Sequence, residues 1–251
     1  MRKAYITLYC DLGDVIYTNR ERSVYSIYTD KIKKYQQDYA NLVDADYICY
    51  GNDIVNDFWK SRKYCDVLAP HVKVTLSKFC TIDDAFKQGY DRVLFTDFDV
   101  IPVGNPANLF EISGSWINDI DDLTKPQYAS TVKVFEYIKE KFELLDLPVN
   151  CFPDGGIYII DKDYWQQFDF YEYLDEFLDF IHHVLGEFDT WITHDETYLA
   201  YLMNKELIQT SHLGIMNDVR WEKDCYLEDL KNDGFYHFYN KNEFKKFLAN
   251  D

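Results

Sequence analysis

Two aspartates stand one residue apart directly after an apolar segment. Residues 93–96 are apolar or β-favouring and predict a short buried strand that ends at Asp97. Because side chains alternate along a strand, Asp97 and Asp99 share a face and Phe98 turns away. Carboxylate oxygens suit Mg²⁺ or Mn²⁺, and a divalent ion at the carboxyl end of a strand can bind a diphosphate. The pair therefore predicts a metal site, with a solvated acidic loop as the alternative in a chain that has 44 acidic residues.

The composition limits the class of partner. The 251 residues are 47% apolar, which is enough to bury a sizeable core in one large α/β domain. The formal net charge of -18 argues against nucleic acid and anionic membranes as partners, because both repel a negative field. A polyanionic substrate would therefore need a bound cation.

The cysteines and the apolar segments predict a cytoplasmic protein. No two cysteines form a Cys-x-x-Cys pair, and several lie beside apolar segments, so we expect reduced thiols. The first nine residues have too short an apolar run for a signal peptide, and no apolar stretch approaches ~20 residues. We therefore expect no transmembrane segment. The six cysteines are Cys10, Cys49, Cys65, Cys80, Cys151 and Cys225.

The elements that must position the aspartates follow a β-α-β pattern. Residues 4–9 alternate as a first strand, with a loop over residues 10–14 at its carboxyl end. Apolar spacing predicts a helix over 23–35, a strand over 46–50 and a second helix over 73–88 that leads into the aspartate strand. Because ligands bind at the carboxyl edge of an open α/β sheet, the aspartates and the first loop should meet there.

A lysine and two glycines could also face a ligand at that edge. Lys78 lies off the apolar stripe of its helix, so it is either a solvated lysine or a cation within reach of an anion held by the aspartates. Gly155 and Gly156 precede an apolar strand over residues 157–160. Paired glycines there indicate either a tight turn or a ligand that approaches the backbone closely.

The second half of the chain is less regular. Residues 104–150 predict a long excursion rather than a domain boundary, with a polar acidic stretch over 115–124 and an inserted helix over 132–145. Residues 170–181 predict a strongly amphipathic helix, followed by His182 and His183 in its cap region.

Three stretches together resemble a known pattern. They are Asp97-Phe98-Asp99, Gly155-Gly156, and His194-Asp195-Glu196-Thr197-Tyr198-Leu199. In this order they resemble metal-dependent, retaining glycosyltransferases with the GT-A fold, above all family 6, which is blood-group-transferase-like, and family 8, which is glycogenin-like. The third stretch resembles the family 6 hallmark, and the resemblance covers residues 4–241.

A late His followed by Lys, here His237 and Lys241, resembles the carboxyl-terminal motif of family 8. The intervening glycine and the closing Pro-Trp of that motif are missing.

The resemblance implies a fold and an activity. It implies a single GT-A, Rossmann-like nucleotide-binding domain over residues 1–251, with a mixed central sheet flanked by helices. Residues 1–103 would be the nucleotide-sugar-binding half, and residues 104–251 the acceptor-binding half with a carboxyl-terminal tail. The activity implied is transfer of a hexose from a nucleotide-diphosphate sugar, usually a UDP-sugar, to a glycan or other hydroxyl acceptor. The transfer would require Mn²⁺ (or Mg²⁺) and retain the anomeric configuration.

The resemblance also implies roles for individual residues. Glu196 would be the catalytic carboxylate beneath the donor's anomeric carbon, either as nucleophile or as stabiliser of an oxocarbenium-like transition state. Asp195 beside it would contact the donor or the acceptor. The metal ligands would be Asp97, Asp99 and His237. The donor-binding residues would be Thr7, Tyr9, Asp11, Lys78, Asp97, Phe98, Asp99 and Lys241. The acceptor-binding residues would be Asp154, Gly155, Gly156 and His194.

Two of these residues also have a purely structural interpretation. Thr193 and Glu196 have the spacing of a capping box, in which each side chain binds the other residue's backbone N–H at the start of a helix. His237 lies among aromatic residues and could be part of an aromatic rim.

Two other classes of protein share part of the pattern. A haloacid-dehalogenase-like, Mg²⁺-dependent phosphatase also carries Asp-x-Asp after a strand, but there the acidic loop follows the first strand of the core, whereas two β-α units come first here. A non-catalytic sugar-nucleotide or glycan-binding protein could use the same scaffold. Turnover of a sugar donor distinguishes both from a transferase.

Overall fold

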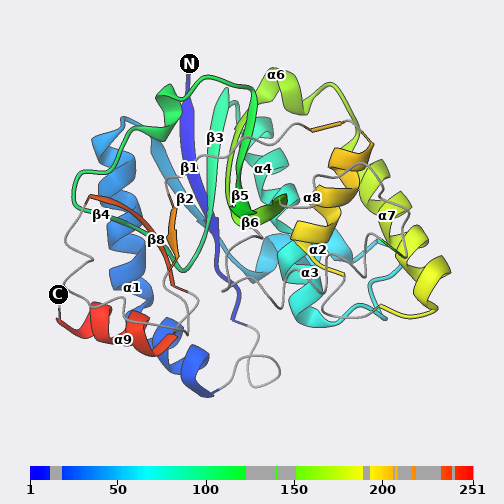
Figure 1. Cartoon of the computed structure of the whole chain (residues 1–251), viewed down its shortest axis with the longest axis horizontal. Helices are drawn as coiled ribbons and strands as arrows, with labels where there is room; N and C mark the ends of the chain where they lie inside the picture. The colour runs from blue at the N-terminus through cyan, green and yellow to red at the C-terminus, as the bar shows by residue number, and fades with distance from the viewer. Residues whose placement is uncertain are drawn as a thin grey trace.

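The computed structural model describes residues 1–11, 19–122, 140, 151–188, 193–205, 207–208, 216–218, 233–238 and 241–250. Within these residues the chain forms two β-sheets with helices around them (Figure 1). The strands are β1 (Lys3–Leu8), β2 (Asp46–Tyr50), β3 (Arg92–Asp97), β4 (Val100–Val103), β5 (Trp116–Asp122), β6 (Cys151–Asp161), β7 (Met216–Asp218) and β8 (Gly234–His237). The helices are α1 (Asn19–Leu42), α2 (Asn52–Trp59), α3 (Pro70–Leu76), α4 (Lys78–Lys87), the 3-10 helix η2 (Leu109–Glu111), α6 (Lys162–Trp165), α7 (Phe170–Leu185), α8 (Asp195–Asn204) and α9 (Lys241–Asn250). Among the described residues, no helix has both the length and the apolar content needed to cross a membrane.

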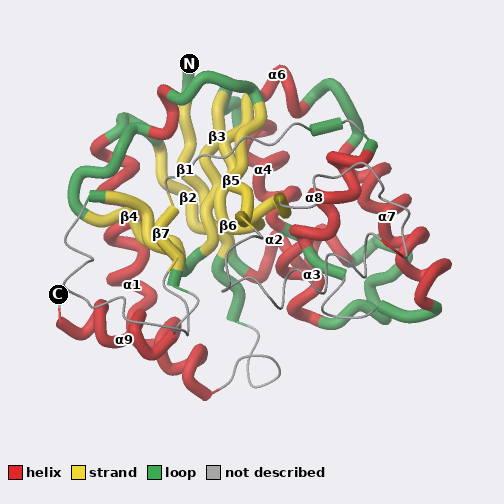
Figure 2. The backbone as a smooth tube through the Cα atoms, viewed as in Figure 1, coloured by secondary structure: helices red, strands yellow, loops and turns green. Residues whose placement is uncertain are grey.

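The central sheet is mixed. Its strand order is β2-β1-β3-β6-β5, in which β1 runs parallel to β2 and β3, and β6 runs antiparallel to β3 and β5. Leu8 pairs with Asp97 in the ladder between β1 and β3, so these two strands end at the same edge. A smaller sheet, β4-β8-β7, begins just after Asp99 and pairs Val100 with His237 (Figure 2). The predicted α/β fold with a mixed central sheet flanked by helices is confirmed.

Helices cover both faces of the central sheet. Figure 1 shows α1 and α9 on one side, and α2, α3, α4, α7 and α8 on the other. Because side chains alternate along β1, Ile6 packs in the core beside α4, whereas Tyr5 packs in the core beside α1. A strand covered on both faces must be apolar throughout, which explains why Val93, Leu94 and Phe95 are all fully buried.

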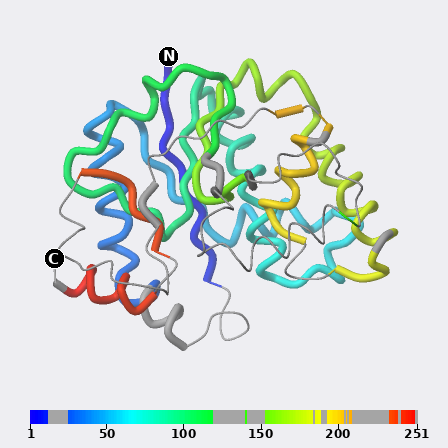
Figure 3. Tube along the Cα trace, viewed as in Figure 1, coloured from blue at the N-terminus to red at the C-terminus, as the bar shows by residue number. Residues whose placement is uncertain are grey.

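The carboxyl-terminal helix returns to the amino-terminal third of the chain. Figure 3 shows α9, in red, beside α1, in blue. Lys31 Nζ donates to the Leu248 carbonyl oxygen at 2.7 Å, and the Phe238 N–H donates to the Asp99 carbonyl oxygen at 3.1 Å. The first bond joins α1 to α9, and the second holds the residue after β8 against the residues that follow β3.

The single helix predicted over residues 73–88 is wrong, because two helices meet there at Ser77. The Ser77 hydroxyl donates to the Lys73 carbonyl oxygen at 2.6 Å and accepts from Trp59 Nε1 at 2.8 Å. A side chain that bonds the backbone within one turn competes with the regular helix pattern and often bends it. As a result α4 starts at Lys78, which is buried rather than solvated.

Two predictions about the second half also change. Gly155 and Gly156 lie inside β6 rather than in a turn before a strand, because β6 begins at Cys151, where it pairs with Asp122 of β5. Most of the acidic, polar stretch expected over residues 115–124 belongs to β5 and pairs with β6. The helix predicted over 132–145 lies outside the described residues, apart from residue 140. The amphipathic helix predicted after it is confirmed as α7.

Candidate active site

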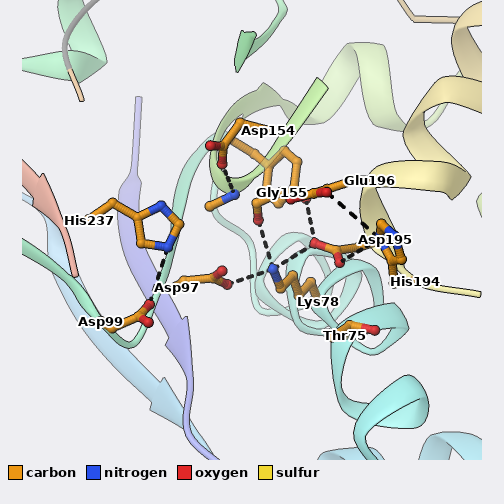
Figure 4. Close-up of polar contacts among 12 residues, drawn as sticks. Thr75, Lys78, Asp97, Asp99, Asp154, Gly155, His194, Asp195, Glu196 and His237 are labelled. Atoms are coloured by element: carbon orange, nitrogen blue, oxygen red, sulfur yellow. Dashed lines mark hydrogen bonds and ion pairs between the residues drawn. The ribbon is translucent and has the colours of Figure 1, made fainter. Parts of the chain in front are cut away.

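Three side chains that could bind a metal ion converge where β3 ends. Asp97 closes β3, Asp99 follows it, and His237 comes from the last position of β8. One potential ligand atom from each lies within 4.8 Å of the other two, and His237 Nε2 is 3.5 Å from Asp99 Oδ1 (Figure 4). Two carboxylates and one imidazole form a donor set that suits a divalent ion such as Mn²⁺. The residues present therefore fit the predicted metal.

The charges around the two aspartates differ. Burial raises the pKa of Asp97 to about 6, against the opposing charge of Lys78. Burial also acts to raise the pKa of Asp99, but Lys241 and His237 outweigh it and hold that pKa well below its usual range. Burial alone would lower the pKa of His237, but the Asp99 carboxylate raises it to about 9. Asp99 is thus ionised and paired with two cations. Asp97 has the negative charges of Asp99 and Asp195 near it, which also act to raise its pKa.

Lys78 contacts three oxygens from three elements, donating hydrogen bonds to two of them and forming an ion pair with Asp97. Its Nζ lies 2.6 Å from Asp97 Oδ1, 2.6 Å from Asp195 Oδ2 and 2.7 Å from the Gly155 carbonyl oxygen (Figure 4). Tyr158 also donates to Asp195 Oδ2, at 3.2 Å. The buried ammonium therefore links the end of β3, the middle of β6 and the start of α8.

Lys241 binds Asp99 in a similar way but has fewer partners among the described residues. Its Nζ donates to Asp99 Oδ2 and, at 2.8 Å, to the Phe238 carbonyl oxygen. Tyr25 donates to the same Asp99 oxygen at 3.2 Å. An ammonium has three hydrogens, so these two acceptors among the described residues leave one hydrogen for a ligand.

A cavity of about 160 Å³ opens beside the aspartates. The ring of Tyr9 stacks on Phe98 at its wall, with centroids 4.5 Å apart and planes 24° apart. Stacked rings offer an aromatic surface to a flat ligand. The other lining residues are Leu8, Cys10, Tyr25, Val74, Thr75, Lys78, Asp97 and Asp99.

The structure places the two remaining donor candidates differently. Thr7 is fully buried, and its hydroxyl has no hydrogen-bond partner in the part of the chain that the structure describes. It does not line the cavity, although it shares a strand face with Tyr9. Asp11 is exposed beyond the end of β1, and its carbonyl oxygen accepts from Asn52 Nδ2 at 2.9 Å.

The paired glycines allow close packing around the site. A Cβ on Gly155 would lie 2.1 Å from Asp195 Oδ2, and a Cβ on Gly156 would lie 2.9 Å from His237 Cε1. No larger residue fits without displacing these side chains. Asp154, which is 2% exposed, accepts from the Gly156 N–H at 2.5 Å. β6 thus brings the expected acceptor residues against both the metal ligands and α8.

The first turn of α8 carries the remaining candidates. His194 Nδ1 is 3.9 Å from Asp195 Oδ1 and 3.9 Å from Glu196 Oε2. Its Nε2 is 3.3 Å from the Thr197 hydroxyl oxygen. The Glu196 side chain is 29% exposed, so a ligand can reach it, whereas Asp195 is buried under Lys78.

The capping box predicted at this turn is wrong. His194 occupies the N-cap position, one residue later than expected, and makes no side-chain capping bond. The Thr193 hydroxyl is buried without a hydrogen-bond partner among the described residues. Glu196 is therefore the second residue of the helix and lacks the geometry of a capping box.

Sequence reasoning missed three hydroxyl-bearing residues of the site, as well as Leu8, Cys10 and Val74 in the cavity wall. Tyr158 lies two positions after Gly156 on the same face of β6, so strand alternation could have indicated it. Tyr25 and Thr75 lie on helices, and no local pattern marks them as neighbours of Asp99 and the cavity.

Comparison with known proteins identifies the fold. No protein-family profile matches the chain, and no curated protein sequence does. A glycosyltransferase involved in the glycosylation of the major capsid of PBCV-1 matches with a TM-score of 0.55 at 10% identity, over 100% of both chains. The galactosyltransferase LgtC, solved with donor and acceptor sugar analogs, matches with a TM-score of 0.51 at 11% identity, over 98% of this chain and 95% of that one. Mouse xyloside xylosyltransferase 1 matches with a TM-score of 0.54 at 11% identity, over 96% of this chain and 98% of that one.

The chain has the GT-A fold. At these identities the likeness concerns the fold alone, and function must be argued from the site. In this GT-A protein the Asp97, Asp99 and His237 side chains, the cavity and the first turn of α8 occupy one edge of the central sheet (Figure 4).

Proposed function

We propose that this protein is a metal-dependent glycosyltransferase. It would transfer a hexose from a nucleotide-diphosphate sugar, a UDP-sugar in the first instance, to a glycan or other hydroxyl acceptor with retention at the anomeric carbon. The observation that carries the proposal is the convergence of Asp97, Asp99 and His237 beside an aromatic-walled cavity. The glycosyltransferases with the same fold support it.

The donor side of the site offers metal ligands, a lysine and an aromatic surface to a nucleotide sugar. Asp97, Asp99 and His237 would hold Mn²⁺ (or Mg²⁺), which when bound neutralises the charge of the departing diphosphate. Lys241 can turn its remaining hydrogen to a phosphate oxygen and stabilise the same charge. The nucleoside would lie against the Tyr9–Phe98 stack, with Asp11 as a further donor-binding residue and Thr7 supporting the strand beneath Tyr9.

The acceptor side holds a carboxylate at a helix amino terminus. When the bond from the anomeric carbon to the diphosphate breaks, positive charge develops on that carbon, and the Glu196 carboxylate can stabilise it. The amino terminus of α8 favours the ionised form of Glu196. Asp195 would support Glu196, while Asp154, Gly155, Gly156 and His194 would line the acceptor's approach.

The two halves of the chain share the metal site. We assign donor binding mainly to residues 1–103 and acceptor binding mainly to residues 104–251, within one domain. His237 and Lys241 belong to the second half but contact Asp99, so that the donor site is complete only when the tail is in place. The proposal includes a cytoplasmic location, supported by free thiols at Cys10, Cys49, Cys65 and Cys80.

Thermal shift measurements with nucleotide sugars test the proposal. UDP with Mn²⁺ should raise the melting temperature, because a ligand that binds only the native state stabilises it by mass action. D97N/D99N should abolish that shift, whereas D57N/D66N, which removes two exposed carboxylates, should leave it unchanged. If D97N/D99N binds UDP with Mn²⁺ as tightly as the parent, the metal site is wrong.

Turnover separates the transferase from the alternatives. A transferase should release UDP slowly from a UDP-sugar even when water is the acceptor, whereas a non-catalytic binding protein should not. A phosphatase of the haloacid-dehalogenase type should instead be stabilised by Mg²⁺ with beryllium fluoride.

A further inference from the structure

The ammonium of Lys78 is surrounded by three protein oxygens. It donates to Asp195 Oδ2 at 2.6 Å and to the Gly155 carbonyl oxygen at 2.7 Å, and it forms an ion pair with Asp97 Oδ1 at 2.6 Å. Its side chain is 9% exposed, the same fraction as that of Lys241, so the two lysines differ in their partners rather than in their burial. Two carboxylates and a carbonyl oxygen within 2.7 Å hold the ammonium between protein groups, whereas a lysine that clamps a diphosphate directs a hydrogen at the ligand.

Lys78 joins segments that the sheet itself does not hold together. The ladder between β3 and β6 ends at the pair Thr96 and Ile157, so Asp97 and Gly155 lie beyond its last pair. Asp195 belongs to α8, which comes from a distant part of the chain. One buried cation therefore sets the distance between Asp97, β6 and the first turn of α8.

We propose that Lys78 is a positioning residue that couples the metal ligand Asp97 to the first turn of α8. Through this contact, Asp195 controls metal affinity without touching the ion. The inference rests on the proposed function, because it requires a metal at Asp97. It gives Lys78 a different role from the donor contact that the sequence resemblance implies.

The sign of the coupling follows from the charges. Lys78 is one cation shared by two carboxylates, Asp97 and Asp195. Without the Asp195 charge, Lys78 would pair with Asp97 alone and compete more strongly with a metal ion for it. The substitution D195N should therefore weaken metal binding, and this effect should depend on Lys78.

Melting temperatures of the metal-free protein test the positioning role. K78M leaves the buried Asp195 carboxylate and the partly exposed Asp97 carboxylate without their shared cation, and it should lower the melting temperature by about 10 °C. K78M/D195N removes one of those carboxylates and should recover at least half of the loss. K87M, which removes an exposed lysine from the last turn of the same helix, should shift the melting temperature by less than ~2 °C. If K78M melts like K87M, the positioning role is wrong.

Mn²⁺ titrations of the parent, D195N, K78M and K78M/D195N test the coupling, and the comparison of D195N with the parent stays valid if K78M folds poorly. D195N should weaken Mn²⁺ binding about fivefold or more relative to the parent. In the K78M background, D195N should weaken it less than about twofold. An equal loss in both backgrounds, or none in either, would overturn the coupling.

The two readouts separate this inference from the proposed function. A parent protein that binds no Mn²⁺ would overturn the metal site, and with it the coupling. The melting temperatures would then still decide whether Lys78 positions Asp97 and α8.

Discussion

Each aspartate of the metal site is paired with one lysine, and the two lysines differ in what else they bind. On the Asp97 side, Lys78 binds three protein acceptors and is held between β6 and α8. On the Asp99 side, Lys241 binds two acceptors among the described residues and stands at the start of α9, beside the cavity-lining Tyr25. Lys78 is shared by two carboxylates, whereas Lys241 contacts one carboxylate and, among the described residues, one carbonyl oxygen.

The difference separates two tasks that one cation cannot perform at once. A cation that fixes a carboxylate in place must keep its bonds, whereas a cation that stabilises a leaving group must be able to give bonds to it. The Asp97 side therefore suits the alignment of the metal with Glu196, and the Asp99 side suits contact with the diphosphate. Four substitutions test this difference between the surroundings of Asp97 and those of Asp99.

The largest effect is expected at Glu196. This residue follows Asp195 in α8, and Asp195 shares Lys78 with Asp97. E196Q removes the negative charge near the anomeric carbon, so we expect transfer to slow by at least ~100-fold, a loss of ~2.7 kcal/mol in transition-state stabilisation. Donor binding and the melting temperature should stay close to the parent's, because Glu196 is partly exposed and takes no part in a capping box. Initial rates with a UDP-sugar, with E172Q on the exposed face of α7 as the control, measure the effect. A variant that keeps most of its rate would remove Glu196 from the mechanism.

Replacing Lys241 should reduce donor affinity without removing the metal ligands. K241A loses a hydrogen bond between charged groups, which is worth roughly 1.5–3 kcal/mol, or about 10- to 150-fold in UDP affinity. Calorimetry at saturating Mn²⁺ measures this loss, and K245A, on the exposed part of α9, is the matched control. Equal affinities of K241A and K245A for UDP would mean that Lys241 serves only to neutralise Asp99.

The sequence predicted the parts of the site whose signals are local. The apolar run before Asp97 predicted β3, because a strand covered on both faces needs consecutive apolar residues. The first β-α-β order also followed from local periodicity. Resemblance to known motifs added His237 and Lys241, whose own neighbours in the sequence say nothing about Asp99.

The parts that the sequence could not predict depend on distant residues. Lys78 looked solvated because helical periodicity reports only on neighbouring turns, whereas its partner Asp195 lies on another helix. The break at Ser77 depends on Trp59, which no spacing rule connects to it. The capping box at Thr193 failed because a short motif fixes neither the first residue of a helix nor the packing of its N-cap.

A smaller effect should follow from crowding the Asp97 side. In G155A the new Cβ would lie 2.1 Å from Asp195 Oδ2, so the Lys78 bridge must shift. Overpacking of this kind costs typically 1–3 kcal/mol of stability. G51A is the matched control, because a Cβ there meets nothing closer than the Tyr9 carbonyl oxygen at 3.9 Å. Urea unfolding compares the two variants, and equal stabilities would show that Asp195 can move freely.

The smallest effect concerns Asp83, which shares α4 with Lys78 but lies away from the metal site. Its carboxylate accepts from Trp165 Nε1 at 3.0 Å and from the Tyr171 hydroxyl at 2.6 Å, and it forms an ion pair with Lys87 Nζ at 2.6 Å. Burial acts to raise the pKa of Asp83, but these donors outweigh it and lower that pKa below its ordinary value.

A lowered pKa in the folded state means that the ionised form stabilises the fold. Asp83 should therefore contribute stability above its unfolded pKa of about 3.9, and this contribution should disappear as the pH falls through the lower folded value. D83N should lower the free energy of unfolding at pH 7 by about 1 kcal/mol, and the difference from the parent should shrink below pH 4. Its Mn²⁺ affinity should match the parent's, because Asp83 pairs with Lys87 rather than with Lys78. A D83N protein with weakened Mn²⁺ binding would show that α4 transmits strain to Lys78, and that the Asp97 side is less rigid than its three short contacts indicate.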